Sequence, residues 1–338
     1  MAVTGSVLAT IAATGLFFRL RFLPDGSSGG DDEIQISVIV PARNEGANLA
    51  KLLSSLAKQE LRAHEVLVVD DQSEDDTAKV AAEWGARVVS GAKLPRGWYG
   101  KPWACHQGAK EARGTWLLFL DADVELEPLA LRRLTGVAAM APTAVISVCP
   151  WHRIESSYEE LSVFFNLLML GGIGAFTWRG NRARGIGLFG QSMMLSKELY
   201  GRLGGHESVK SQILENLCFS KRCEDLGVTR YCFAGRGGVS MRMFSSGFGE
   251  MVQSWAKGFS SGAGIVPPVA MGLSVVWLTG LMMVTLASML SPLAEEKWMV
   301  LGAYLATLPM MVFLFRRVGR FSFLNAVLFP FSLTFYLV

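Results

Sequence analysis

Two acidic residues directly follow an apolar segment near the middle of the chain. Residues 116–120 read WLLFL, which predicts a buried β-strand, and Asp121 and Asp123 come immediately after it. Carboxylates at positions i and i+2 after a strand can bind one divalent cation and leave ligand positions for phosphate oxygens. Oxygen ligands of this kind favour Mg²⁺ or Mn²⁺. Asp-x-Asp pairs are also common in surface turns, so the surrounding sequence has to decide.

Two further polar groups stand where a predicted strand ends. The segment IQISVIVPA predicts a strand that leads into PARNE (residues 41–45), and HEVLVVDD predicts a second strand that ends in Asp70 and Asp71. Predicted helices follow each strand, and this alternation indicates an α/β fold with a mostly parallel sheet. Such sheets bind ligands at the carboxyl ends of their strands, so all three groups are expected along one edge.

The strand-end motifs resemble a known family. PARNE, VVDDQSEDDTA (residues 68–78) and FLDADV (residues 119–124) are similar to the nucleotide-sugar domain of family-2 glycosyltransferases, which has the GT-A fold. Further segments resemble a membrane-bound branch that acts on carotenoid acids and hopanoid-associated lipids. These are GWYGKPWACHQGAKEA, SVCPWHRI, GLFGQSMML, GGHESV and the group of Gln253, Trp255 and Lys257. The resemblance covers residues 36–263 and implies a UDP-sugar donor with Mg²⁺ or Mn²⁺ at Asp121 and Asp123.

The resemblance assigns donor contacts to the strand ends. It implies that Asp70 and Asp71 contact the uracil and ribose, and that Glu45 reaches the ribose hydroxyls. The implied set of nucleotide-sugar contacts also includes Pro41, Ala42, Lys101 and Asp121. A carboxylate accepts hydrogen bonds from a ring N–H or a hydroxyl, and a lysine offers a phosphate a point charge. The structural alternatives are a helix N-cap role for Asp70 or Asp71 and a solvated Lys101.

Glu215 is the catalytic residue that the resemblance implies, because these enzymes place a Glu-Asp pair on the corresponding helix. The second position is here Asn216, and an amide cannot act as the general base for an alcohol acceptor. Either Glu215 is itself the base, or the acceptor is a carboxylic acid, which has a pKa of about 4 and is an anion at neutral pH. The structural alternative for Glu215 is an exposed helix acid.

Two further groups are expected to contact the acceptor. His206 and Glu207 belong to GGHESV, while Gln253, Trp255 and Lys257 resemble the amide and aromatic platform of processive relatives. The spacing of that platform differs, because Lys257 stands where an arginine before tryptophan is expected. We therefore do not expect processive transfer. Trp255 and Lys257 also suit an anchoring role at a membrane interface.

The glycines of GIGLFG (residues 185–190) match the letters of a dinucleotide-binding fingerprint. That fingerprint follows a strand and opens a helix, whereas GIGLFG follows the irregular WRGNRARG and leads into a predicted strand. We therefore expect a loop that closes on the donor sugar.

The apolar content of the chain predicts membrane helices. The chain has 338 residues, of which 51% are apolar, and its uncharged segments are residues 1–18, 258–294, 298–315 and 321–338. A membrane helix needs about 20 apolar residues, so these segments predict four spans. The first is expected to be a retained anchor, because MAVTGSV lacks the basic residues of a signal peptide.

Charges beside these segments predict the topology. Basic residues, which favour the cytoplasmic side, follow the first segment at Arg19 and separate the third from the fourth in RRVGR, whereas the acidic LAEEKW separates the second from the third. We expect residues 19–262 in the cytoplasm and the protein in the cell membrane. The expected organisation is an anchor (1–20), a linker (21–33), the GT-A domain (34–263) and three membrane helices (264–338).

Charge and cysteine usage exclude other classes. The net charge of +3, without a dense stripe of Lys and Arg, argues against a nucleic-acid partner. The five cysteines form no CxxC pair, which indicates reduced thiols, and the four histidines lack zinc-binding spacing.

The sequence thus predicts an inverting, metal-dependent transferase that moves a hexose from a UDP-sugar to a lipid in the bilayer, such as a carotenoid acid or hopanoid-type lipid. Two alternatives stay open. A polyprenyl phosphate acceptor would need additional cations, which Arg179, Arg182 and Arg184 could supply. A membrane-anchored scaffold with a decayed transferase domain is disfavoured by the acids at all three strand ends.

Overall fold

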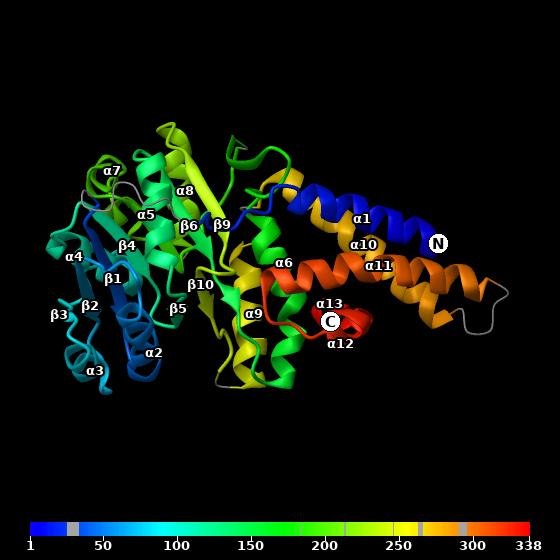
Figure 1. Cartoon of the computed structure of the whole chain (residues 1–338), viewed down its shortest axis with the longest axis horizontal. Helices are drawn as coiled ribbons and strands as arrows, with labels where there is room; N and C mark the ends of the chain where they lie inside the picture. The colour runs from blue at the N-terminus through cyan, green and yellow to red at the C-terminus, as the bar shows by residue number, and fades with distance from the viewer. Residues whose placement is uncertain (26–33, 183, 213, 246, 263–265, 291–295) are drawn as a thin grey trace. The chain divides into compact units, whose positions relative to one another are not determined.

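The computed structural model describes residues 1–25, 34–182, 184–212, 214–245, 247–262, 266–290 and 296–338. These residues form two compact units (Figure 1). The helix unit consists of Met1–Leu20, Trp151–Ile186 and Met243–Val338, and the sheet unit consists of Arg21–Pro150 and Gly187–Arg242. Each unit is therefore assembled from segments that are far apart in the sequence.

The sheet unit is built on a seven-stranded sheet of order β3-β2-β1-β4-β8-β6-β9. The strands are β1 (Ile36–Ala42), β2 (Glu65–Asp70), β3 (Arg87–Ser90), β4 (Trp116–Leu120), β6 (Val145–Cys149), β8 (Ser192–Ser196) and β9 (Arg230–Ala234). Only β8 runs antiparallel to its neighbours. Strands β4 and β6 are buried along their whole length, as expected for strands covered on both faces. The predicted α/β fold with a mostly parallel sheet is confirmed.

Helices alternate with the strands as the sequence predicts. They are α2 (Gly46–Ala57), α3 (Thr77–Glu83), α4 (Gly100–Glu111), α5 (Ala130–Met140), α7 (Lys197–Arg202), the short 3₁₀ helix η3 (His206–Val209) and α8 (Glu215–Asp225). A short antiparallel pair, β5 (Val124–Leu126) with β10 (Val239–Met241), extends the unit beyond the sheet. Helix α2 buries Leu49, Leu52, Leu53 and Leu56, whose spacing places them on one face.

Gly108 sets how closely α4 approaches the sheet. A Cβ atom at this position would lie 2.5 Å from Cγ2 of Ile39 on β1 and 3.0 Å from Cγ2 of Val69 on β2. No larger side chain fits there without moving the helix, since interiors are close-packed. The glycine therefore holds α4 against the strands and fixes the position of Lys101 in its first turn.

The helix unit contains α1 (Ala2–Phe17), β7 (Trp151–His152), two 3₁₀ helices, η1 (Ser157–Ser162) and η2 (Gly180–Arg182), and helices α6 (Val163–Gly172), α9 (Phe248–Gly262), α10 (Pro268–Leu290), α11 (Lys297–Val318), α12 (Phe323–Val327) and α13 (Phe329–Leu337). Glycines bring α1 and α10 into backbone contact, because a Cβ at Gly5 would lie 2.6 Å from the carbonyl oxygen of Gly280. A buried hydrogen bond from Thr307 to Ser6, 3.0 Å long, joins α11 to α1. Small residues and buried hydroxyl pairs of this kind are typical of helix packing in lipid.

Two helices among the described residues, α10 and α11, are long and apolar enough to cross a membrane. Helix α1 is shorter, with 16 residues. The prediction of one spanning helix over residues 321–338 is wrong: the chain turns at Leu328 and forms α12 of five residues and α13 of nine. Pro330 at the start of α13 cannot continue a preceding helix, and nine residues extend only about 14 Å. The expected count of four spans is therefore not confirmed.

Candidate active site

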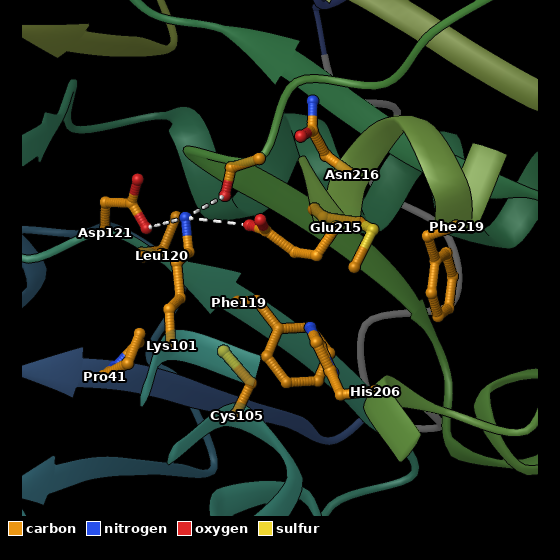
Figure 2. A pocket seen from close by; sticks show the side chains of 12 residues that line it. Pro41, Lys101, Cys105, Phe119, Leu120, Asp121, His206, Glu215, Asn216 and Phe219 are labelled. Carbon is orange, nitrogen blue, oxygen red and sulfur yellow. Dashed lines mark hydrogen bonds and ion pairs between the residues drawn. The ribbon is translucent and has the colours of Figure 1, made fainter. Parts of the chain in front are cut away.

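A pocket in the sheet unit opens at the carboxyl ends of β1 and β4 (Figure 2). Its lining comes from β1, β4 and β8 together with α4, η3 and α8. Pro41 and Asp121 stand at the strand ends, Lys101 projects from α4, and Glu215 and Asn216 begin α8. The pocket therefore combines residues that the sequence separates by more than a hundred positions.

The strand-end acids share one edge because the strands that carry them run parallel. Ala42 of β1 lies beside Asp70 of β2, and the backbone N–H of Asp71 donates to the carbonyl of Ala42 at 2.8 Å. Strand β4 pairs with the other side of β1, which brings Asp121 to the same edge. Convergence of polar strand ends is the geometry expected for ligand binding in a parallel sheet.

The loops after β1 and β2 are fastened to each other. Asn44 and Gln72 both have a positive φ, 56° and 59°, which marks two sharp turns. The Asn44 side-chain oxygen Oδ1 accepts from the backbone N–H of Glu74 at 2.8 Å, and the backbone N–H of Asn44 donates to Ser73 Oγ at 2.9 Å. The backbone N–H of Glu45 donates to Thr77 Oγ1 at 2.9 Å. Glu45 is thereby held at the sheet edge near the acids.

Asp75 accepts the hydrogen bonds at the helix starts. The sequence had suggested a helix N-cap role for Asp70 or Asp71. Its carboxylate accepts from the N–H of Thr77 at 2.9 Å and from that of Gly46 at 3.1 Å, at the starts of α3 and α2. The Thr77 hydrogen bonds lower the pKa of Asp75. The N-cap alternative for Asp70 and Asp71 is therefore wrong: Asp70 accepts from Ser73 N–H within its own turn. The acidic SEDDT segment was the sequence signal for this role.

Lys101 connects the two sides of the pocket. Its Nζ lies 2.6 Å from Asp121 Oδ1 and 3.4 Å from Glu215 Oε1, and it donates to the Gly190 carbonyl at 3.3 Å (Figure 2). The side chain is 35% exposed. Burial alone would lower the pKa of this amine, but the charges of Asp121 and Glu215 outweigh it and raise the pKa, so the amine is an ammonium ion.

Asp123 is a buried acid whose charge is only partly compensated. Its Oδ1 is buried and has no hydrogen-bond partner among the described residues. Burial, followed by the nearby charges of Asp121 and Glu45, raises the pKa of this carboxyl to about 6. A buried oxygen with no donor, beside two other carboxylates, is an arrangement that a divalent cation would stabilise.

The donor set fits such a cation only in part. The described residues contain no cluster of three or more His, Cys, Asp or Glu side chains able to hold a metal. Asp121 and Asp123 together provide two carboxylates. Mg²⁺ is commonly bound through one or two carboxylates together with water and substrate phosphate oxygens. The pair is therefore suited to a cation that arrives with a phosphate-bearing ligand.

The start of α8 forms the opposite wall of the pocket. Glu215 is the first helical residue, and its side chain is 13% exposed with Oε1 directed toward Lys101. Asn216, the departure from the family pattern, donates from Nδ2 to the carbonyl of Leu188 at 2.5 Å. It thus fastens the loop before β8, which carries Gly190, and this structural role was not predicted from the sequence.

His206 and Glu207 have different positions, although the sequence assigned both to the acceptor. His206 is buried in the pocket wall against Phe119 and Phe219, with Nδ1 3.0 Å from the Tyr200 hydroxyl. Burial and the Lys101 charge lower the pKa of His206 to about 3, so the ring is neutral. Glu207 is exposed. The pocket lining also includes Cys105, below Lys101, which the sequence did not single out.

The expected aromatic platform belongs to the helix unit. Trp255 on α9 stacks on Phe165 of α6 with ring centroids 3.6 Å apart and an interplanar angle of 6°. Gln253 is exposed, and the side chain of Lys257 lies outside the described residues. One face of the Trp255 ring is thus occupied within its own unit. Arg179 and Arg184 of the helix unit are exposed, and the Arg182 side chain is outside the described residues.

Comparison with known proteins identifies the family of the chain. The model of the Glycosyl transferase family 2 domain matches residues 37–190. A 4,4'-diaponeurosporenoate glycosyltransferase of Staphylococcus haemolyticus (strain JCSC1435) is 37% identical over 275 residues, which are 78% of this chain and 72% of that protein. A protein of the same name from Staphylococcus aureus (strain USA300) is 31% identical over 339 residues, covering 98% of this chain and 89% of its own.

A solved structure extends the comparison to the fold. The mannosyltransferase PcManGT from Pyrobaculum calidifontis, solved in complex with GDP-Man and Mn2+, superimposes with a TM-score of 0.52 at 16% identity, covering 99% of this chain and 98% of that one. At this identity the likeness shows the GT-A fold. The matches in sequence carry the assignment further: the chain belongs to glycosyltransferase family 2, in the branch of the 4,4'-diaponeurosporenoate glycosyltransferases.

Proposed function

We propose that the protein transfers one hexose from a UDP-sugar to the carboxylate of a membrane lipid, of the carotenoid-acid type, with inversion at the anomeric carbon. The observation that carries the proposal is the placing of Glu215 across the pocket from Asp121, with Lys101 between the two acids. The names of the relatives support a carotenoid acid as acceptor.

Donor binding is assigned to the strand-end side of the pocket. Asp70, Asp71 and Glu45 would accept hydrogen bonds from the uracil ring and the ribose hydroxyls, and Lys101 would face the diphosphate. Asp121 and Asp123 would hold Mg²⁺ or Mn²⁺, which fits the unpaired, buried oxygen of Asp123. When bound, such a cation offsets the negative charge that grows on a leaving diphosphate.

Acceptor chemistry is assigned to the α8 side. An acceptor oxygen attacks the anomeric carbon while the bond from that carbon to the diphosphate oxygen breaks, so the configuration inverts in one step. Glu215 would orient the acceptor or take its proton. A lipid carboxylate is already ionised above its pKa of about 4, and this removes the need for the second acid that Asn216 replaces.

A lipid acceptor requires the pocket to work at a membrane. Helices α10 and α11 are long and apolar enough to span one, and they support a multi-pass protein. Arg316 and Arg317 lie in the last turn of α11, whereas Glu296 precedes its first turn. Basic residues favour the cytoplasmic side, so we assign the Arg316 end of α11 and the catalytic domain to the cytoplasm.

The direct test of the function is mass spectrometry of lipids from cells that make a carotenoid acid. Cells that express the protein should accumulate a hexosyl ester of that acid. Cells that express Asp121→Asn should not, because a neutral amide is a poorer ligand for a hard cation. Absence of the hexosyl ester from cells that express the wild-type protein would refute glycosylation of this acceptor, and equal amounts of ester in both cultures, at equal protein levels, would refute the role of Asp121.

Asp123→Asn tests whether the Asp123 carboxylate destabilises the protein when no metal is bound. Unfolding restores the ordinary carboxyl pKa of 3.8 from about 6, so the folded protein loses stability as pH rises from 4 through 6. The amide lacks this penalty. Without divalent metal, the variant should therefore be more stable than the wild type at pH 8, by roughly 1–3 kcal/mol, and this gain should vanish near pH 4.

Thermal unfolding at the two pH values, in EDTA, measures this difference. Asp225→Asn is the matched control, because Asp225 is exposed and pairs with Lys221 on the surface of α8. It should show no stabilisation specific to high pH. A loss of stability by Asp123→Asn at pH 8 would contradict an only partly compensated carboxylate at this position.

Glu215→Gln tests which acceptor the site is built for. The variant should retain transfer to a lipid carboxylate and lose transfer to an alcohol analogue, because only the alcohol needs a base; removing a general base costs roughly 10²–10⁴ in rate. Single-turnover rates with the two acceptors provide the measurement. Equal, thousand-fold losses on both acceptors would rule out the carboxylate explanation.

A further inference from the structure

Lys101 forms an ion pair with Asp121, the carboxylate to which the proposed cation would bind. Its Nζ is 2.6 Å from Asp121 Oδ1, the length of a strong, charge-assisted hydrogen bond. An ammonium ion at this distance repels a divalent cation that approaches the same oxygen. The protein without ligands therefore carries its own counter-ion where the metal is expected.

The surroundings of Lys101 hold the ammonium there. The Gly190 carbonyl accepts from it at 3.3 Å, and Glu215 Oε1 lies at 3.4 Å on the far side of the pocket. Gly190 is itself close to α8, because a Cβ atom at this position would meet Glu215 Oε1 and Asn216 Cβ at 3.3 Å. The ammonium thus has acceptors from β4, from α8 and from the loop before β8, and moving it breaks contacts with all three.

Asp123 has no direct ion pair with Lys101. Its buried Oδ1 has no hydrogen-bond partner among the described residues, although it stands two positions from Asp121. The Lys101 ammonium thus pairs directly with Asp121 and acts on Asp123 only through its nearby charge. A cation that enters alone must displace the ammonium from Asp121 without offering it a new anion.

We propose that Lys101 is an internal gate that keeps Asp121 closed to divalent cations until a diphosphate enters the pocket. The diphosphate supplies the replacement anion for the ammonium, so donor and cation bind together and the cation alone binds weakly. The same displacement frees Glu215 from its contact with Lys101, which couples donor loading to the acceptor side. This inference rests on the proposed function in taking a diphosphate as part of the donor and Asp121 as a ligand of the cation.

The test is a titration of the full-length protein with Mn²⁺, followed by the electron paramagnetic resonance signal of free Mn²⁺, with and without UDP. Without UDP, Lys101→Met should bind Mn²⁺ about tenfold more tightly than the wild type or better, because a charged hydrogen bond no longer competes. UDP should tighten Mn²⁺ binding strongly in the wild type and much less in the variant. A merely structural role for Lys101 would weaken binding in both conditions.

Two further variants make the result decisive. Lys221→Met removes an exposed lysine that pairs with the exposed Asp225 on α8, and it should bind Mn²⁺ as the wild type does. Lys101→Gln keeps a polar group and should also bind Mn²⁺ more tightly than the wild type without UDP. It replaces Lys101→Met in the titration if Lys101→Met folds poorly. Equal or weaker Mn²⁺ binding by folded Lys101 variants, while UDP still enhances binding in the wild type, would overturn the gate but not the proposed function. An absence of Mn²⁺ binding in every protein, even with UDP, would overturn both.

Discussion

Repulsion between acids at one edge of the sheet is the constraint on which the site depends. Burial, followed by the nearby charges of Asp121 and Glu45, raises the pKa of Asp123, and Lys101 offsets the charge of Asp121 and Glu215. Such an arrangement costs stability in the free protein, as is common where a fold is adapted to bind a ligand. This loss of stability favours ligand binding if a divalent cation supplies the missing positive charge together with the donor.

The fold holds these charges in place by means that are distant from them. Parallel pairing of β1 with β2 and β4 brings the acidic strand ends together. Gly108 lets α4 lie on the sheet so that Lys101 reaches Asp121, and Asp75 ties the starts of α2 and α3 to each other. Rigid support of this kind is what keeps like charges from separating, because flexible loops would relax and move them apart.

The sequence predicts the part of the site that follows from local pattern. Strands, their order of alternation with helices, and acids at strand ends are all readable, because side-chain periodicity and the parallel connection are local properties. The contact of Lys101 with Glu215 and the bond from Asn216 to Leu188 are not readable, because they join α4 to α8 and α8 to a loop through tertiary packing. The role of Asp75 was missed, since only Asp70 and Asp71 were considered from the sequence for the contact at the helix start.

Composition did not show that residues 321–338 form two helices and not one. Residues 321–338 lack charge, but Ser322 caps α12 through the N–H of Asn325, and Pro330 starts a second helix. Glu160 accepts from Asn325 Nδ2 at 2.8 Å, which fastens this end of the chain within the helix unit. An apolar segment can thus be divided by caps and a proline that a hydropathy average does not detect.

The central claim is that Asp121 and Asp123 hold one cation together with the donor diphosphate. Crystals grown with UDP and Mn²⁺ test it directly, because Mn²⁺ has an anomalous scattering signal that locates the ion without reference to the refined side chains. A cation held in this way should give one strong peak in contact with both carboxylates and with the diphosphate, and the Lys101 ammonium should be displaced from Asp121. Bound UDP with no Mn²⁺ peak at these carboxylates would contradict it.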